Sequence, residues 1–194
     1  DCSSECHGDP INTSTGEFFD HKVDIEAVGT GLIPSVERSF STINKDTLNL
    51  LGYGWRTNYE MKIVSDSSNE NYDPNILTSR VILMENENSS VSSFYRKDDG
   101  SFEGSTKTRA ALSYDPVTQT FKYIRDNEEI YTFNSAGKLI RIENDQNQIV
   151  TLTYQNGKLH TVSDTRGNAL TFAYNANNLI STITTQNGKV TTYT

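Results

Sequence analysis

Cysteine, tryptophan and long apolar runs are scarce in this sequence of 194 residues, and acidic residues outnumber basic ones. The longest apolar runs, such as residues 81–84, are far too short to span a bilayer. No charged stretch followed by an apolar one stands at the N-terminus, so we expect any export signal to lie outside this chain. Because 17 Lys and Arg against 25 Asp and Glu give a net charge of -8, a phosphate backbone would be repelled. We therefore expect no nucleic-acid partner and no membrane span.

The only two cysteines, Cys2 and Cys6, stand at the start of the chain beside His7. Three interpretations stay open: a small terminal disulfide, two free thiols, or half of a metal site that residues elsewhere complete. A zinc site needs about four ligands, and no such cluster is present locally. The sequence therefore favours the first two interpretations and predicts no metal site and no cofactor.

The amino-acid composition favours strands and turns. Hydrophobic residues make up only 34% of the chain, whereas Thr, Ser, Asn, Tyr and Phe are abundant. These residue types are typical of β-strands and of the turns between them rather than of helices. The length allows one large all-β domain or a small domain followed by repeats, and we favour the second.

A repeat of 20 residues organises the C-terminal part of the sequence. Two sets of positions recur with this period: the leucines Leu139, Leu159 and Leu179, and the turn residues Gly137, Gly157 and Asn177. Glycine and asparagine tolerate a positive φ better than other residues, so the second set predicts a tight turn in each repeat.

Between those turns the chain alternates between apolar and polar residues, as a half-buried strand does. Val150, Leu152 and Tyr154 are predicted to share one face of their strand, and Leu170, Phe172 and Tyr174 are predicted to share the same face one repeat later. Tyr131 and Phe133 fit the same pattern with an offset of one residue, which a longer turn at residues 134–138 would absorb. Further turns are predicted at residues 145–148, 164–168 and 186–188.

Each period thus holds two strands and two turns, which make a β-hairpin. A single hairpin is only marginally stable in water, so we expect successive hairpins to pair edge to edge in one continuous sheet. The sequence stops in the middle of a unit, and we expect it to be a fragment of a longer polypeptide.

The N-terminal half has no clear period, but it also predicts strands between turns. Strands are expected at residues 23–28, 35–40, 60–64 and 80–84, and a hairpin between residues 94 and 102. The predicted fold is all-β: an antiparallel sheet of consecutive hairpins at residues 109–194, preceded by a small β-rich domain at residues 1–108.

Two N-terminal stretches resemble the opening of the Rhs/YD-repeat core. The first is residues 8–17, GDPINTSTGE, followed by PSVERSF at residues 34–40, and the second is LGYGWRTNY at residues 51–59. Together they resemble the domain that precedes the repeats in Rhs proteins, wall-associated proteins and polymorphic toxins. The downstream units, including residues 163–183, look like YD repeats, so the resemblance covers nearly the whole chain.

The resemblance implies that arrays of such repeats wind into a spiral sheet, which closes as a hollow shell around a C-terminal toxin domain. Members of the family often carry a self-cleaving DPxG-type motif near the end of the shell, and this sequence contains none. The resemblance therefore implies a wall segment without chemistry of its own, secreted or on the surface of a bacterium. Its partners would be the remainder of the same polypeptide, namely further repeats and the toxin.

Few residues are candidates for chemistry, and each has a simpler interpretation. Trp55 between two small or polar neighbours could stack on a sugar, but a buried anchor is favoured. His7, His21 and His160 form no HExxH pair and accompany no GxSxG elbow. Acidic residues at 98–99 and 126–129 lie in predicted turns, where solvated charge is ordinary. Oxygen-rich turns at residues 145–147 and 164–168 could bind calcium, but they lack the ligand spacing of an EF-hand.

We accordingly predict no catalytic, cofactor-binding or metal-binding residue, and a structural role in intercellular competition. The chief alternative is a module that binds cell-surface carbohydrate or a receptor through exposed Tyr and Phe of the repeats. A glycosidase or protease is a distant third, since it requires a deep pocket with convergent ionisable groups.

Overall fold

The structure is a computed structural model that describes residues 11–12, 16–70, 72–106, 108–126 and 128–194. Strands dominate the described residues, and the one helical element among them is the 3-10 turn η1 (Thr42–Asn44). The all-β prediction is confirmed. None of the helical segments in this part of the chain has the length and apolar character needed to cross a membrane.

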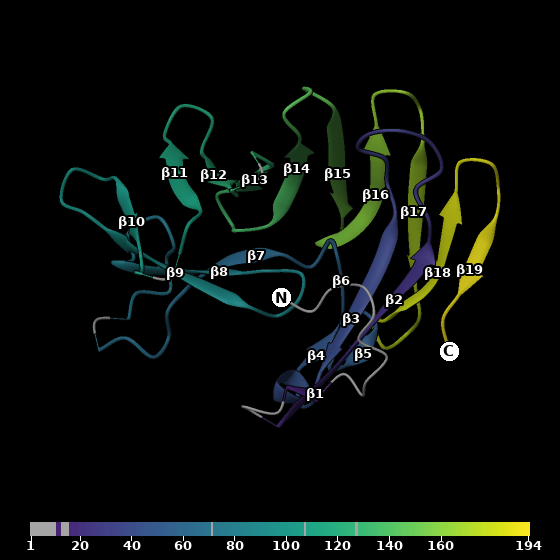
Figure 1. Ribbon diagram of the computed structural model, residues 1–194, viewed down its shortest axis with the longest axis horizontal. Coiled ribbons are helices and arrows are strands. Elements are labelled where there is room, and N and C mark those ends of the chain that lie inside the picture. The colour runs from purple at the N-terminus through teal and green to yellow at the C-terminus, as the bar shows by residue number, and fades with distance from the viewer. Residues whose placement is uncertain (1–10, 13–15, 71, 107, 127) are drawn as a thin grey trace.

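The C-terminal half forms one antiparallel sheet of nine strands, in which each strand pairs with the next along the chain (Figure 1). Its strands are β11 (Ala111–Asp115), β12 (Thr120–Ile124), β13 (Ile130–Asn134), β14 (Leu139–Glu143), β15 (Ile149–Gln155), β16 (Lys158–Asp164), β17 (Ala169–Tyr174), β18 (Ile180–Thr185) and β19 (Val190–Thr192). The prediction of consecutive hairpins that pair edge to edge is confirmed. We call this sheet the hairpin sheet.

Three smaller sheets precede it. The first contains β1 (Ile11–Asn12), β2 (Glu17–Ile25), β3 (Val36–Ser41) and β6 (Trp55–Thr57); the second contains β4 (Leu48–Asn49) and β5 (Gly52–Tyr53); the third contains β7 (Lys62–Ser65), β8 (Val81–Glu85), β9 (Val91–Arg96) and β10 (Phe102–Gly104). The strands expected at 35–40, 60–64 and 80–84 correspond to β3, β7 and β8, and the hairpin expected at 94–102 is β9–β10. The strand expected at 23–28 is wrong at its end, because β2 stops at Ile25.

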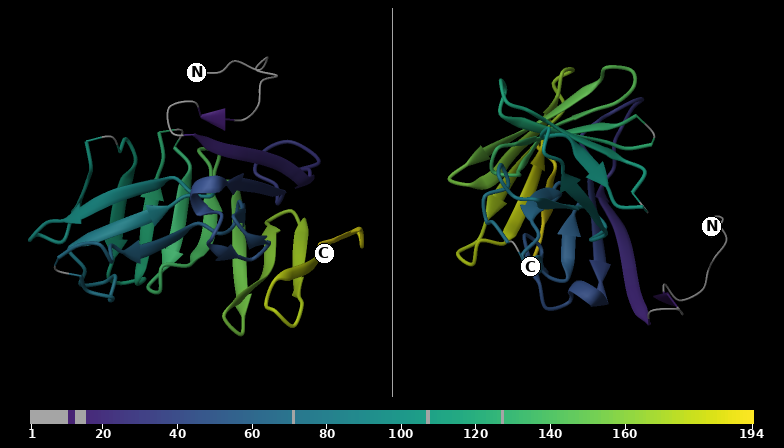
Figure 2. Two further views of the ribbon diagram at one scale, coloured as in Figure 1. Left: turned by 90° about the horizontal axis from the view of Figure 1, so that it is seen from below. Right: turned by 90° about the vertical axis from the view of Figure 1, so that its left-hand side faces the viewer.

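The small sheets lie against the inner face of the hairpin sheet, which curves around them (Figures 1 and 2). Aromatic rings meet edge to face across the contact: Tyr59 and Phe172 have centroids 6.1 Å apart, and Phe94 and Tyr123 have centroids 6.0 Å apart. A single hydrophobic cluster includes buried residues of both parts of the chain. The two predicted parts, residues 1–108 and 109–194, thus share one core. Their division into separate domains stays a prediction.

The alternation predicted for the repeats is confirmed. The buried side chains in these strands are Val150, Leu152, Leu170 and Phe172. Intervening residues, such as Thr151, face solvent. A period-2 pattern buries one side of each strand, and here that side faces the small sheets.

The third repeat is one residue out of step with the predicted period. The residue with positive φ is Asn178 rather than Asn177, and the buried residue after the turn is Ile180 rather than Leu179. The physical reason is turn length. Asn156 and Gly157 close a two-residue turn, whereas Asn175 donates its amide to the Leu179 carbonyl around a longer one. The longer turn that was predicted at residues 134–138 is present: the Asn134 amide donates to the Lys138 carbonyl.

A tyrosine and a lysine recur with the same geometry in two neighbouring units. The hydroxyls of Tyr154 and Tyr174 donate to the carbonyls of Leu139 and Leu159, each at 2.8 Å. The ammonium groups of Lys138 and Lys158 lie 5.2 and 5.1 Å from the centroids of the same two rings. Burial raises the pKa of both phenols, that of Tyr174 to about 12. We call this pair the tyrosine–lysine clamp, because it joins one hairpin to the next.

The clamp hydroxyls should contribute to stability. Tyr154→Phe and Tyr174→Phe should each lower the free energy of unfolding by about 1 kcal/mol, because each leaves a partly buried carbonyl without its donor. Urea denaturation measures this. Tyr95→Phe, at a half-exposed tyrosine of β9, is the control and should have no effect. Equal losses in all three variants would contradict the clamp.

Candidate functional site

The small sheets are joined to the hairpin sheet by hydrogen bonds along both rows of its turns. In one row the amide of Ile63 donates to the carbonyl of Gly137 at 2.9 Å, and the amide of Ile180 donates to the carbonyl of Leu50 at 2.7 Å. In the other row the loop between β2 and β3 meets the turns. We call these contacts, together with the Arg125 cluster described below, the seam.

The loop side of the seam relies on two long polar side chains. The amide of Leu32 donates to Oε1 of Gln148 at 2.7 Å, and Arg166 donates to the carbonyl of Thr30 at 2.9 Å. Gly31 has a φ of +88°, and a Cβ there would lie 2.1 Å from Gln148 Oε1. Only glycine allows the loop to approach the turn this closely.

Arg125 is the centre of a charged cluster in the seam. Its guanidinium donates to both carboxylate oxygens of Glu87, at 3.0 and 2.5 Å, and to Asn86 Oδ1 at 3.2 Å. The same guanidinium lies 4.7 Å from the ring centroid of Tyr131, whose hydroxyl donates to Glu129 at 2.8 Å. Glu87 stands in the β8–β9 turn and Arg125 follows β12, so the pair links the third small sheet to the hairpin sheet.

Burial and pairing shift the protonation equilibria of this cluster. Burial by itself would lower the pKa of Arg125, but the hydrogen bonds that it donates to Glu87 and the charges around it raise that pKa overall. Burial raises the pKa of Tyr131 well above its ordinary value. Arg125 therefore stays cationic and Tyr131 neutral.

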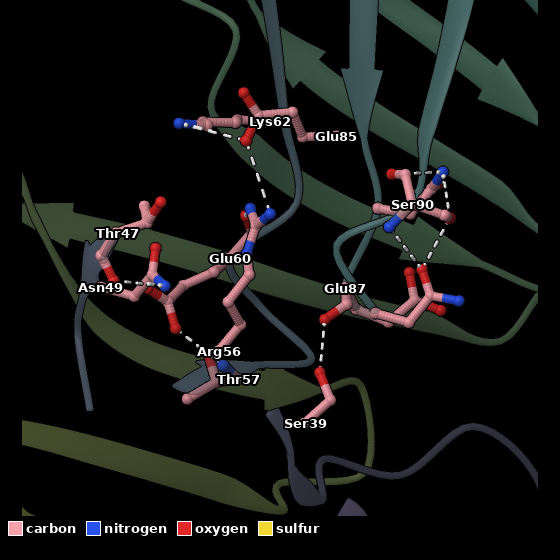
Figure 3. A network of polar contacts seen from close by, with 12 residues as sticks. Ser39, Thr47, Asn49, Arg56, Thr57, Glu60, Lys62, Glu85, Glu87 and Ser90 are labelled. Atoms are coloured by element: carbon pink, nitrogen blue, oxygen red, sulfur yellow. Dashed lines mark hydrogen bonds and ion pairs between the residues drawn. The ribbon is translucent and has the colours of Figure 1, made fainter. Parts of the chain in front are cut away.

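A second polar network holds the small sheets together beneath the seam (Figure 3). The Glu60 carboxylate accepts the amides of Leu50 and Thr57 at 2.8 and 2.7 Å, and Arg56 donates to the Glu60 carbonyl at 2.6 Å. Arg56 also lies 3.4 Å from Glu85, which pairs with Lys62 at 3.2 Å. Burial raises the pKa of the Glu60 carboxyl against the effect of these donors.

Hollows lie along the seam. One of about 310 Å³ is bounded by Tyr59, Arg125, Glu129 and Tyr131, among others. Another of about 710 Å³ lies between the end of β2 and the start of β17. The polar side chains of the first hollow bond to one another as described above, so the arrangement is suited to holding sheets together.

Trp55 is only partly the buried anchor that was predicted. It is half-buried and lies outside the buried core. Its ring centroid is 5.4 Å from that of Phe40, and the Arg38 guanidinium carbon lies 4.5 Å above it. A Cβ at Gly54 would lie 2.5 Å from the Phe40 ring, so the glycine does permit close packing, as expected.

The two described histidines are on different strands. His21 lies on β2 and contacts Glu37 at 3.1 Å, whereas His160 lies within β16 as predicted. The cysteines Cys2 and Cys6, together with His7, are outside the described residues, so the interpretations of that segment stay open.

The acidic clusters lie in turns, as predicted. Asp98 is exposed and pairs with Arg80 at 2.9 Å, and Asp99 accepts the Ser101 hydroxyl at 2.6 Å. At the turn of residues 164–168 the Asp164 carboxylate accepts the Asn168 side chain at 2.6 Å. Within the described part of the chain, no three His, Cys, Asp or Glu side chains gather as a metal site would require.

Sequence reasoning missed the seam itself. The partners of Arg125, Gln148 and Arg166 are 38, 116 and 136 residues away along the chain. No local pattern marks such pairs, and the one available signal was the pair of glycines Gly29 and Gly31 in the loop between β2 and β3.

The comparison with known families concerns the small sheets. Residues 8–91 match the family model DUF6531, a domain of unknown function. This similarity covers β1 to β8 and the first residue of β9, including Glu87 of the seam. No curated protein matches the chain.

Two glycines allow the backbone side of the seam to be tested. Gly137 and Gly157 have nearly the same φ, +77° and +78°, but a Cβ at Gly137 would lie 2.0 Å from the Ile63 carbonyl oxygen, whereas at Gly157 the nearest atom is 3.8 Å away. Gly157→Ala should lower the unfolding free energy by about 1–2 kcal/mol through backbone strain alone. Gly137→Ala should cost clearly more in urea denaturation, since it also forces β7 away. Equal losses would contradict the seam contact.

The Arg125–Glu87 pair should be energetically coupled. In a double-mutant cycle with Arg125→Met and Glu87→Gln, we expect a coupling of about 1–2 kcal/mol, because the pair is partly buried and bidentate. The exposed Arg80–Asp98 pair is the matched control and should show no measurable coupling. Unfolding in urea supplies the four free energies of each cycle. A coupling at Arg125–Glu87 no larger than in the control would show that the cluster does not join the sheets.

Proposed function

We propose that this chain is a non-enzymatic wall segment of an exported bacterial Rhs/YD-repeat protein, whose sheet encloses a C-terminal toxin domain for competition between cells. The observation that carries the proposal is the hairpin sheet, in which strands β11 to β19 pair strictly in chain order. A sheet built in this way grows by adding hairpins, as a shell wall must.

The regular joints between units support the same proposal. Each of three successive units has a register shift just before its turn, at residues 132/133, 153/154 and 173/174. Such bulges increase local twist and bend a sheet, which is how a flat array becomes a curved wall. The tyrosine–lysine clamp then fastens two of these units, those of Tyr154 and Tyr174, to the preceding hairpin.

The N-terminal part supports a role in closing the wall. It resembles the domain that precedes the repeats in Rhs proteins, and the match of residues 8–91 to a family model falls on the same stretch. Its strands cover the inner face of the hairpin sheet, so the apolar side of this segment is sealed from water. We infer that it fills one end of the enclosed space.

The alternative function, binding of cell-surface carbohydrate or a receptor, depended on exposed aromatics in the repeats. Every Tyr and Phe between residues 111 and 193 is described, and each is buried or half-buried. Several of them, such as Phe121, Phe133 and Phe172, belong to the core. Flat exposed rings are what a sugar would stack on, so the wall segment is the better supported function.

Imaging of the longer polypeptide by electron cryomicroscopy tests the proposal. We expect the sheet to continue from β19 through further hairpins and to surround a compact passenger. A parent gene that encodes no repeats after Thr194, or a parent particle without an enclosing sheet, would rule the proposal out. Protease resistance of the passenger, lost in Gly137→Ala but kept in Gly157→Ala, would connect the seam to enclosure.

A further inference from the structure

Strand β2 has an open edge along most of its length. β1 pairs only with Glu17 and Phe18, and β3 occupies the other side of β2. From Phe19 to Ile25 the outer edge pairs with no strand that the structure describes. β2 runs along the margin of the molecule in Figure 2, and only near its C-terminal end does it contact the hairpin sheet, where the Tyr193 hydroxyl donates to Asp24 at 2.9 Å. A long edge with free backbone groups is a site at which another strand can add.

The hydrogen-bonding direction of each β2 residue follows from its contacts. The amide of Phe18 donates to Thr42 Oγ1, just beyond the end of β3, whereas the amide of His21 is accepted by the neighbouring Asp20 carboxylate at 2.9 Å. Because successive residues point their backbone groups to opposite edges, Phe19, His21 and Val23 present theirs to the open edge. The side chains of these three residues also share one face of the sheet.

The sequence of this edge is complementary to itself. If two copies pair antiparallel about His21, Phe19 of each copy faces Val23 of the other. Asp20 of each copy likewise faces Lys22 of the other. Phe19 and Val23 are each 50% exposed in the single chain and would cover one another. Centring the pair on Asp20 would instead place two aspartates opposite each other, and centring it on Lys22 would place two lysines opposite. Like charges directly opposite destabilise a strand pair, so of these three registers the one centred on His21 is favoured. A pairing centred on Val23 would place Lys22 opposite Asp24, but Asp24 is already bound by Arg38 and Tyr193.

We propose that two copies of this chain associate edge to edge through β2, antiparallel and centred on His21. Backbone groups of Phe19, His21 and Val23 form about six hydrogen bonds between the copies, and for this the His21 amide exchanges the Asp20 carboxylate for the facing strand. The ion pairs of Asp20 with Lys22, one within each chain at 3.2 Å, are exchanged for two pairs between the chains. A contact of this size suits a reversible dimer rather than an obligate one.

A charge swap in the 194-residue chain tests the register. In sedimentation equilibrium up to about 500 µM, the wild type should dimerise, and Asp20→Lys or Lys22→Asp alone should weaken dimerisation about tenfold, because each places like charges opposite at two positions. The double variant Asp20→Lys/Lys22→Asp should restore it. Lys97→Glu and Glu103→Lys, at an exposed pair on the β9–β10 hairpin, are the control and should change nothing. A monomeric wild type, or a double variant as weak as the single ones, would overturn the proposal.

Cross-linking provides an independent test that does not depend on the charge variants folding. In a Cys2→Ser/Cys6→Ser background, His21→Cys should form a disulfide-linked dimer on oxidation, since facing Cα atoms in such a pair lie about 5.5 Å apart, within reach of a disulfide. Val117→Cys, on the exposed β11–β12 turn, is the matched control. Cross-linking that is no faster at position 21 than at position 117 would contradict the two-fold contact.

Discussion

The need to cover one apolar face of the hairpin sheet is the constraint on which the rest of the structure depends. Amphipathic strands joined by short turns bury only one side, and that side must lie against another layer. Val36, Met61, Ile63 and Met84 of the small sheets provide this layer within the same hydrophobic cluster. The small sheets are therefore part of the core of the repeats, and their polar contacts with the turns fix how they lie on it.

Polar groups at the two rows of turns fix the position of the small sheets, which hydrophobic burial alone does not determine. Burial is not directional, so it does not by itself determine where the small sheets come to rest. Hydrogen bonds such as Ile63 to Gly137 and Leu32 to Gln148 are directional, and they hold opposite margins of the layer. Arg125 adds a charged contact at a third point, through Glu87. These contacts give the covering layer a single position.

The repeats show how a wall can tolerate variation in sequence. The turn after β15 is one residue shorter than the turns after β13 and β17, yet Phe133, Tyr154 and Tyr174 occupy equivalent places opposite Leu139, Leu159 and Ile180. The same bulge precedes all three turns, so the joint is kept although the turn length changes. Under the proposed function, this explains why the Tyr-Asp dipeptide that gives YD repeats their name is not required: Gln155 and Asn175 follow the two clamp tyrosines without changing the joint.

The sequence by itself determined the hairpins, because alternation of apolar residues and the turn preferences of Gly and Asn act over only a few neighbours. It predicted the unit length to within one residue, and failed at Asn178 and Ile180 because a single added turn residue is compatible with the same pattern. Only the tertiary structure decided which face is covered, and which distant side chains, such as Arg125 and Glu87, meet in the seam. Those contacts depend on sheet curvature and on a covering layer more than 30 residues away, which no local pattern encodes.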